Sequence, residues 1–263
     1  MRLYWEVAKR AFQNQLAYRT ANLAGLATNA FFGYIRATVF LTAFRGQGTI
    51  GGYDAATTVT YAWTTQALIM IVHLWGWYLV EKTIRDGSIV FDLSKPFSFL
   101  GFWLARDFGR AFYFLLFRAG PVLLMGQLMF SLRWPQQPAT WLAALLSLAL
   151  AVVVSFGWRF LLNLTAFWTT DMRGLAMVAN AIVLFLSGFA VPIRFFPDWL
   201  RSITLALPFA SITQIPSEVF LEQLTGVDLI SALAQQAAWA AVMLGASQLA
   251  LTAATRRVAT QGG

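Results

Sequence analysis

The sequence has little charge and no cysteine. Of its 263 residues, 59% are hydrophobic and only 11% are charged, whereas a soluble domain is about 25% charged. The lack of cysteine excludes disulfides, zinc–thiolate sites and thiol nucleophiles. The charges cluster in short patches between long apolar stretches. Because a water-soluble fold could not cover its surface with so few ionic groups, the sequence predicts an all-α membrane protein.

Motifs for nucleotide or metal chemistry are also missing. The chain has no G-x-x-x-x-G-K-[ST] loop to hold the phosphates of ATP. Its single histidine, His73, and scattered carboxylates form no metal-ligand pattern. His73 lies in a predicted span without an acidic residue to orient it as a base, and an isolated histidine of this kind more often bonds a neighbouring helix. We therefore expect no catalytic residue, metal site or cofactor in this chain.

A bilayer core is crossed by about 20 apolar residues of helix. The sequence predicts six such spans, near residues 23–44, 57–80, 111–132, 139–167, 175–193 and 229–254. All 11 acidic residues fall outside these spans or at their margins, which argues against an ion-coupling site within them. No internal repeat of the kind common in secondary transporters is evident. An energy source outside this chain is the favoured interpretation.

The basic residues predict the orientation of the spans. Lys9, Lys82, Lys95 and most arginines outside the spans fall on the side of both termini, and such residues prefer the cytoplasmic side. We predict that both termini are cytoplasmic in a bacterial plasma (inner) membrane. The net charge of +8 is thereby explained without nucleic acid as a partner.

Residues 2–19 are predicted to form an amphipathic helix. Apolar side chains recur every fourth residue, at Tyr4, Ala8, Phe12 and Leu16. Such a helix lies flat at a membrane interface, and the alternative is a docking surface for a cytoplasmic partner.

Two connecting segments are too apolar for plain loops. Residues 81–97 interleave acids and bases with apolar side chains, which favours a short helix resting against another protein. Residues 194–226 are broken by Pro208 and are too short to span twice. We predict two half-helices that dip into the outer leaflet and pack on the bundle or on a second subunit.

Three arginines lie within predicted spans. An uncompensated charge there costs at least about 2.5–3.5 kcal/mol. Arg118 and Arg159 can extend toward an interface or lie against loops, whereas Arg36 is the deepest in an uncharged stretch. Arg36, His73 and Arg118 are the candidates for a substrate path or a subunit interface. Spans rich in aromatic residues would suit hydrophobic or cationic amphiphilic substrates, whereas the arginines would suit anionic ones. The sequence therefore does not decide the class of substrate.

Two stretches carry a resemblance to a known family. They are RDGSIVFDLSKP at residues 85–96, and SGFAVPIRFFPDWL at residues 187–200 with the later Leu207-Pro208-Phe209 and Pro216. Together with the predicted spans, they resemble the permease subunits of ABC-2 exporters, in particular the subgroup with viologen-exporter-like permeases. The likeness extends over essentially the whole chain.

The resemblance implies a division of labour between subunits. A separate cytoplasmic ATPase dimer holding ATP and Mg²⁺ would dock on the 81–97 segment, with six candidate coupling residues: Arg85, Asp86, Ile89, Phe91, Asp92 and Lys95. A second permease chain, identical or related, would complete the path, and residues 1–263 would form one transmembrane domain among membrane lipids. The alternatives are a stand-alone channel or secondary carrier, or a membrane-embedded enzyme or scaffold.

Overall fold

Helices form all of the long elements in the computed structural model, which describes residues 2–46, 48–169 and 171–261. No strand occurs among these residues, only an isolated bridge between Ile50 and Tyr53. A chain this apolar favours helices because each helix satisfies its own backbone hydrogen bonds where water is absent. The prediction of an all-α fold is confirmed.

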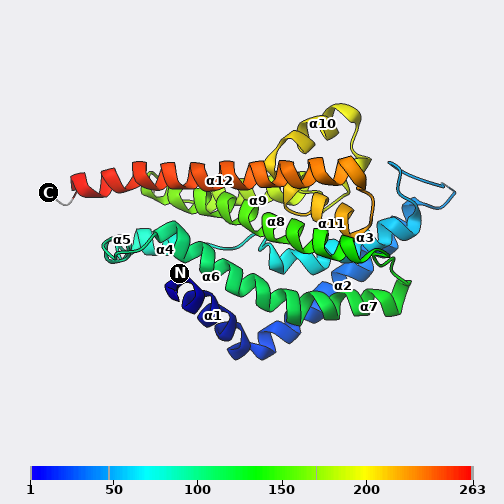
Figure 1. Ribbon diagram of the computed structural model, residues 1–263, viewed down its shortest axis with the longest axis horizontal. Helices are drawn as coiled ribbons and strands as arrows, with labels where there is room; N and C mark the ends of the chain where they lie inside the picture. The colour runs from blue at the N-terminus through cyan, green and yellow to red at the C-terminus, as the bar shows by residue number, and fades with distance from the viewer. Residues whose placement is uncertain (1, 47, 170, 262–263) are drawn as a thin grey trace.

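In the described part of the chain, three helices are long and apolar enough to cross a membrane: Phe99–Phe130, Pro138–Phe167 and Gly226–Arg256. The first joins α6 (Phe99–Phe114), a π-helical turn η1 (Leu115–Ala119) and α7 (Gly120–Phe130). The second is α8 (Pro138–Leu164) with the short η2 (Thr165–Phe167), and the third belongs to α12 (Gly226–Gln261). α8 and α12 lie side by side through the middle of the molecule (Figure 1).

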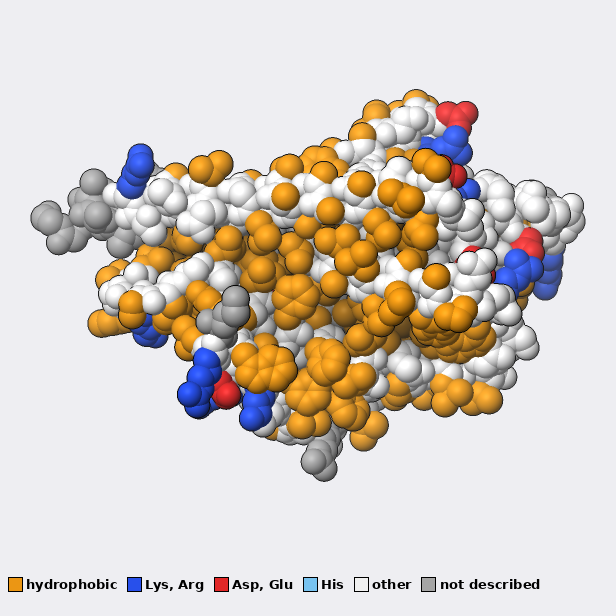
Figure 2. All heavy atoms as spheres, viewed as in Figure 1, with side chains coloured by type: hydrophobic (Ala, Val, Ile, Leu, Met, Phe, Trp, Pro, Cys, Tyr) orange, Lys and Arg blue, Asp and Glu red, His pale blue; other side chains and the backbone are white. Residues whose placement is uncertain are grey.

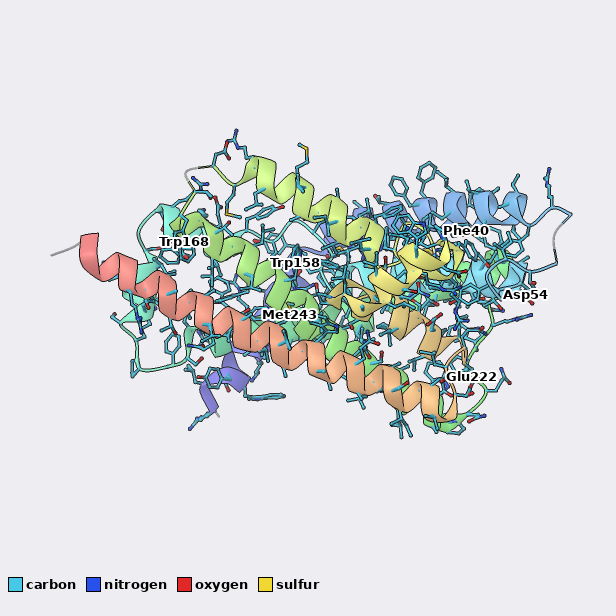
Figure 3. The ribbon with its side chains drawn as sticks, turned by 90° about the horizontal axis from the view of Figure 1, so that it is seen from above. Phe40, Asp54, Trp158, Trp168, Glu222 and Met243 are labelled. Atoms are coloured by element: carbon cyan, nitrogen blue, oxygen red, sulfur yellow. The ribbon has the colours of Figure 1, made fainter. Side chains whose placement is uncertain are left out.

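Glycine brings α8 and α12 close together. A Cβ atom at Gly157 of α8 would lie 2.6 Å from the Cβ of Met243 on α12, well inside van der Waals contact. Met243 and Trp158 both lie in the middle of the molecule, away from its two ends (Figure 3). The absence of a side chain at Gly157 therefore sets the separation of these two helices.

The helices α2 (Arg19–Ala43), α3 (Ala55–Ile71) and α9 (Arg173–Leu186) correspond to the other predicted spans. The prediction of one span over residues 57–80 is wrong for its C-terminal part, because α3 ends at Ile71. His73 and Gly76 then adopt positive φ angles of 51° and 83°. The predicted span 175–193 also ends early, at a turn where Gly188 has φ 83°.

The start of the third predicted span, 111–132, is also wrong. Its helix begins at Phe99 and runs without interruption to Phe130. Asp107 therefore lies inside a candidate membrane span, contrary to the expectation that every acid is outside or at a margin. It is almost fully buried, and its neutralising partners come from this helix and from α8, as described below.

The first helix, α1 (Arg2–Ala17), agrees with the predicted 2–19 element and packs along α6. The Tyr4 hydroxyl accepts the backbone N–H of Ser98 at 3.1 Å. Phe12 contacts the rings of Phe112 and Tyr113. Protein thus covers the apolar face of α1 at these points, and its position relative to a bilayer stays a prediction.

The predicted 81–97 and 194–226 segments contain short helices. The first holds the end of α4 (Leu79–Arg85) and α5 (Ile89–Leu93). The second contains α10 (Asp198–Ala206) and α11 (Gln214–Phe220), separated by the 3₁₀ turn η4 (Pro208–Ser211), with η3 (Ile193–Phe195) at its start. Every residue of α11 is buried, and it packs on α8 and α3. How deeply α10 and α11 enter a bilayer stays a prediction.

The bundle has two distinct ends. The start of α1, the end of α12, and α4 with α5 lie toward one end in Figure 1, whereas α10 and the loop before α3 lie toward the other. Trp168 marks the first end, and Asp54 and Glu222 mark the second (Figure 3).

Candidate functional site

A buried ion cluster joins α6 to α8 close to the end of α3. The Asp107 carboxylate accepts Nε of Arg110 at 2.9 Å and Nη2 of Arg159 at 2.7 Å. These three residues are 3–8% exposed. Arg110 also donates to the backbone carbonyls of Met70 and Ile71 at the end of α3. These carbonyls carry partial negative charge because they lie at the C-terminal end of a helix. They help to offset the second cation, since the cluster contains two arginines and only one carboxylate.

The segment between α3 and α4 is fixed by polar side chains of α8. Ser155 donates to the Val72 carbonyl at 2.6 Å. Asn163 donates to the Trp77 carbonyl at 2.9 Å and accepts the backbone N–H of Glu81 at 2.9 Å. Backbone groups that a continuous helix would have paired internally are therefore paired by α8. This attachment connects α4 directly to the centre of the bundle.

The α4–α5 region projects beyond this attachment. Phe91 is 73% exposed, whereas Ile89 is 2% exposed and packs inside. Asp86 accepts the backbone N–H and the hydroxyl of Ser88, and these hydrogen bonds hold the pKa of Asp86 below its usual value. Asp92 pairs with Lys95 at 2.6 Å. The segment is thus a folded tip with an apolar end.

The six predicted coupling residues therefore fall into three groups. Ile89 belongs to the core and cannot itself contact a partner, while Phe91 faces outward. The charged members stabilise the tip locally, since Arg85 pairs with Glu81 in α4. Val90, which was not among the six, is 50% exposed beside Phe91. Its apolar side chain next to Phe91 was the available sequence signal.

Arg36 lies where α2, α3 and the end of α9 meet. Its guanidinium donates to the Thr65 hydroxyl at 3.0 Å and to the Phe189 carbonyl. It also lies 4.6 Å from the centre of the Phe189 ring. No acidic side chain among the described residues forms an ion pair with it. Arg36 is thus a cation held by neutral groups, as a substrate path or an interface would allow.

Arg118 and His73 have different surroundings from Arg36. Arg118 is only 7% exposed, donates to the Asn29 side chain at 3.2 Å and occupies the space left open by Gly25 of α2. This geometry favours packing within the chain. His73 lies in the irregular segment after α3, not in the middle of a helix. The structure does not bring the three predicted residues into one site.

A buried polar network at the other end was not predicted. Tyr53 donates to Glu218 at 2.8 Å, and Arg194 pairs with the same carboxylate. The Tyr61 hydroxyl lies 2.5 Å from Oε1 of Gln214. Burial, together with the Glu218 carboxylate, raises the pKa of Tyr53 above its usual value, so its hydroxyl remains a donor. Polar residues four apart in α11, Gln214 and Glu218, were the available sequence signal.

Glu222 accepts hydrogen bonds from the start of α8, at the same end of the bundle as Tyr53 and Glu218. Its Oε1 accepts the backbone N–H groups of Gln136 and Gln137 at 3.0 Å each and the Thr140 hydroxyl at 2.8 Å. The bonds from Gln137 and Thr140 hold the pKa of Glu222 below its usual value. Glu222 thus supplies the acceptor that the first backbone donors of a helix require.

We expect Glu222→Ala to lower the free energy of unfolding by about 1 kcal/mol, as for loss of a helix cap. Because folding lowers the pKa of Glu222, this contribution is present above the pKa of the unfolded chain, near 4.5. It is lost as the pH falls through the lower pKa of the folded state. Melting temperatures of wild type and variant should therefore differ at pH 7, and the difference should shrink as the pH falls below about 4.5. A difference that stays constant with pH would contradict this role.

The described residues contain no group of three or more His, Asp and Glu side chains placed to hold a metal ion. A family model described as "ABC-2 family transporter protein" matches residues 31–262. No curated protein and no solved structure matches the chain. The family match covers α3 to α12 and the greater part of α2.

Proposed function

From the premise that the chain belongs to the ABC-2 transporter family, we propose that it is the membrane-spanning permease subunit of an ATP-driven exporter. Family membership and the long apolar helices make it a multi-pass membrane component of a transporter. The cytoplasmic position of both termini, a bacterial inner membrane and the export direction are parts of the proposal. The likeness to viologen-exporter-like permeases is also part of the proposal.

The proposed coupling to an ATPase rests on the exposed tip of α4–α5. Phe91 and Val90 are exposed at the end of a segment whose base is bonded to α8. Since the chain lacks a phosphate-binding loop, a partner ATPase dimer would bind ATP and Mg²⁺. Closure of that dimer would press on the tip and move the base against α3 and α8. The energy of ATP binding would thereby shift the bundle between two arrangements.

A second permease chain would complete the path beside Arg36. Large apolar side chains near it remain exposed on α2 and α9, among them Phe31, Phe32, Val178 and Phe185. Extended apolar surfaces of this kind mark contacts with protein or lipid. We place the second chain, identical or related, against this surface.

The test of the coupling is Phe91→Ala. We expect at least about a tenfold loss of affinity for the partner ATPase, because a buried aromatic anchor commonly dominates an interface. Leu128→Ala is the control, since Leu128 is 78% exposed on α7, far from the tip. Co-purification with the tagged chain and ATP-dependent flux in liposomes provide the measurements.

Two results would count against the proposal. One is equal recovery of the ATPase with Phe91→Ala and with wild type. The other is substrate flux through the purified chain alone, without ATP, which would instead support a channel or secondary carrier.

A further inference from the structure

Two adjoining apolar cavities form a groove on the side of the bundle. They measure about 260 and 140 Å³ and share Ile71, Leu115, Leu145 and Leu148. The Phe99–Phe130 helix and α8 form the walls, and α3 forms the floor. Figure 2 shows hydrophobic side chains gathered over this face, with a hollow where α8 runs beside α6 and α7. Neither Arg36 nor any residue of the α4–α5 tip lines the groove.

The walls of the groove offer almost no hydrogen-bonding group. The Thr64 hydroxyl is bonded to the Thr60 carbonyl at 2.8 Å. Nε1 of Trp134 is bonded to Gln127 at 2.8 Å. Apart from Trp141, the other lining residues have hydrocarbon or phenyl side chains or are glycine. A water molecule needs two to four polar partners, so the groove selects an apolar occupant.

The groove is about as long as one acyl chain. Along α8 it runs from Trp141 to Val152, which corresponds to about 16 Å at ~1.5 Å per residue. The two cavities are continuous through the four residues that they share. A single extended hydrocarbon chain matches this length and the apolar lining.

The position of the groove matches one leaflet of a bilayer. Its length is about half of a hydrocarbon core of ~30 Å. Trp134 and Trp141 lie at one end of it, and tryptophan is enriched at membrane interfaces. Beside the groove, Leu116, Leu124 and Leu142 are more than half exposed, as expected where helices face lipid. The groove therefore opens sideways into the region that acyl chains occupy.

We propose that this groove is a binding site for one acyl chain of a bilayer phospholipid, whose head group lies beside Trp134 and Trp141. The π-helical turn Leu115–Ala119 contributes to the opening, because such a turn inserts an extra residue into the helix and two of its residues line the wall. The bound lipid is a structural ligand that seals the bundle. This assignment does not depend on the transport function.

Gly120→Leu tests the assignment by filling the groove. Apart from its chain neighbours and the backbone of its own helix, a Cβ atom at Gly120 would meet no atom within 4 Å, and the same holds at Gly245 on α12, which is outside the groove. Gly245→Leu is therefore the control for the added side chain. Gly120→Ala, which places a Cβ before Pro121 but leaves the groove open, is the control for the backbone. After purification in detergent, native mass spectrometry should show one phospholipid per chain in wild type and control, and about tenfold lower occupancy in Gly120→Leu. Added dioleoyl phosphatidylglycerol should raise the melting temperature of wild type and control more than that of Gly120→Leu.

Equal phospholipid occupancy in Gly120→Leu and Gly245→Leu would overturn the proposal. So would a smaller oligomer with unchanged bound lipid, because the groove would then be a contact between copies of the chain. Where Gly120→Leu does not yield folded protein, Gly120→Met places a thinner and more flexible side chain in the same space. It should lower the occupancy in the same direction, and no change would again refute the lipid site.

Discussion

Replacing Asp107 by asparagine is expected to destabilise the protein by about 3–5 kcal/mol, because removing one member of a buried ion pair leaves an uncompensated charge. Here two charges would be left, since Asp107 accepts from both Arg110 and Arg159. Asparagine keeps the size of the side chain and one oxygen acceptor, so the loss reports the charge. Such a change is a large fraction of the stability of a domain. Most of the variant should fail to appear as a monodisperse peak in detergent.

A second Asp–Arg pair with the same spacing provides the control. Asp198 and Arg201 are paired at 2.8 Å three residues apart on α10, as Asp107 and Arg110 are on α6. The Asp198 side chain is 90% exposed, and an exposed pair contributes about 0–1 kcal/mol. Asp198→Asn should therefore leave the melting temperature nearly unchanged. Similar melting temperatures for the two variants would show that Asp107 is not the counter-ion of the cluster.

A double variant separates charge from packing in this cluster. Asp107→Asn combined with Arg159→Met removes one anion and one cation and leaves Arg110 bonded to the carbonyls of Met70 and Ile71. If unpaired charge causes the loss, the double variant should be more stable than Asp107→Asn alone, as a double-mutant cycle would measure. Additive losses would indicate that shape, not charge, dominates.

The sequence predicted best the longest apolar helices. α8 and α12 agree with the predicted spans because nothing in either stretch competes with the helix, whose buried apolar face provides most of its stability. The break after Ile71 was not predictable in the same way, since residues 57–80 are uncharged and read as one span. The groups that replace the helical hydrogen bonds, Arg110, Ser155 and Asn163, lie on other helices.

The error at the start of the third span has the same origin. Asp107 and Arg110 looked like residues of a cytoplasmic loop because each is charged. In the structure Asp107 pairs with both Arg110 and Arg159. The pairing with Arg159 becomes visible only once α6 and α8 are side by side. For the candidate site, the sequence predicted the 81–97 segment, whose coupling role stays a prediction, and only burial distinguishes Phe91 from Ile89.

Gly109→Ala is expected to have the second largest effect, a loss of about 3 kcal/mol, at the upper end for overpacking of a tight contact. A Cβ atom at Gly109 would lie 2.0 Å from the backbone oxygen of Ala8 in α1. The atom in the way is backbone, so no side chain can rotate to make room, and α1 must move as a whole. The prediction is that α1 separates from α6 while the remaining bundle stays folded, which makes residues 2–17 accessible to protease.

The matched control for Gly109→Ala lies on α12. Gly245 has open space around its missing Cβ and is not followed by proline, so Gly245→Ala should stabilise its helix by about 0.5–1 kcal/mol. The two substitutions are chemically identical, and opposite shifts in melting temperature would isolate the contact with Ala8. Equal shifts would show that α1 is not held at Gly109. If protease cuts α1 in Gly109→Ala and the ATPase is lost as well, α1 also contributes to docking; retained ATPase would confine docking to the α4–α5 tip.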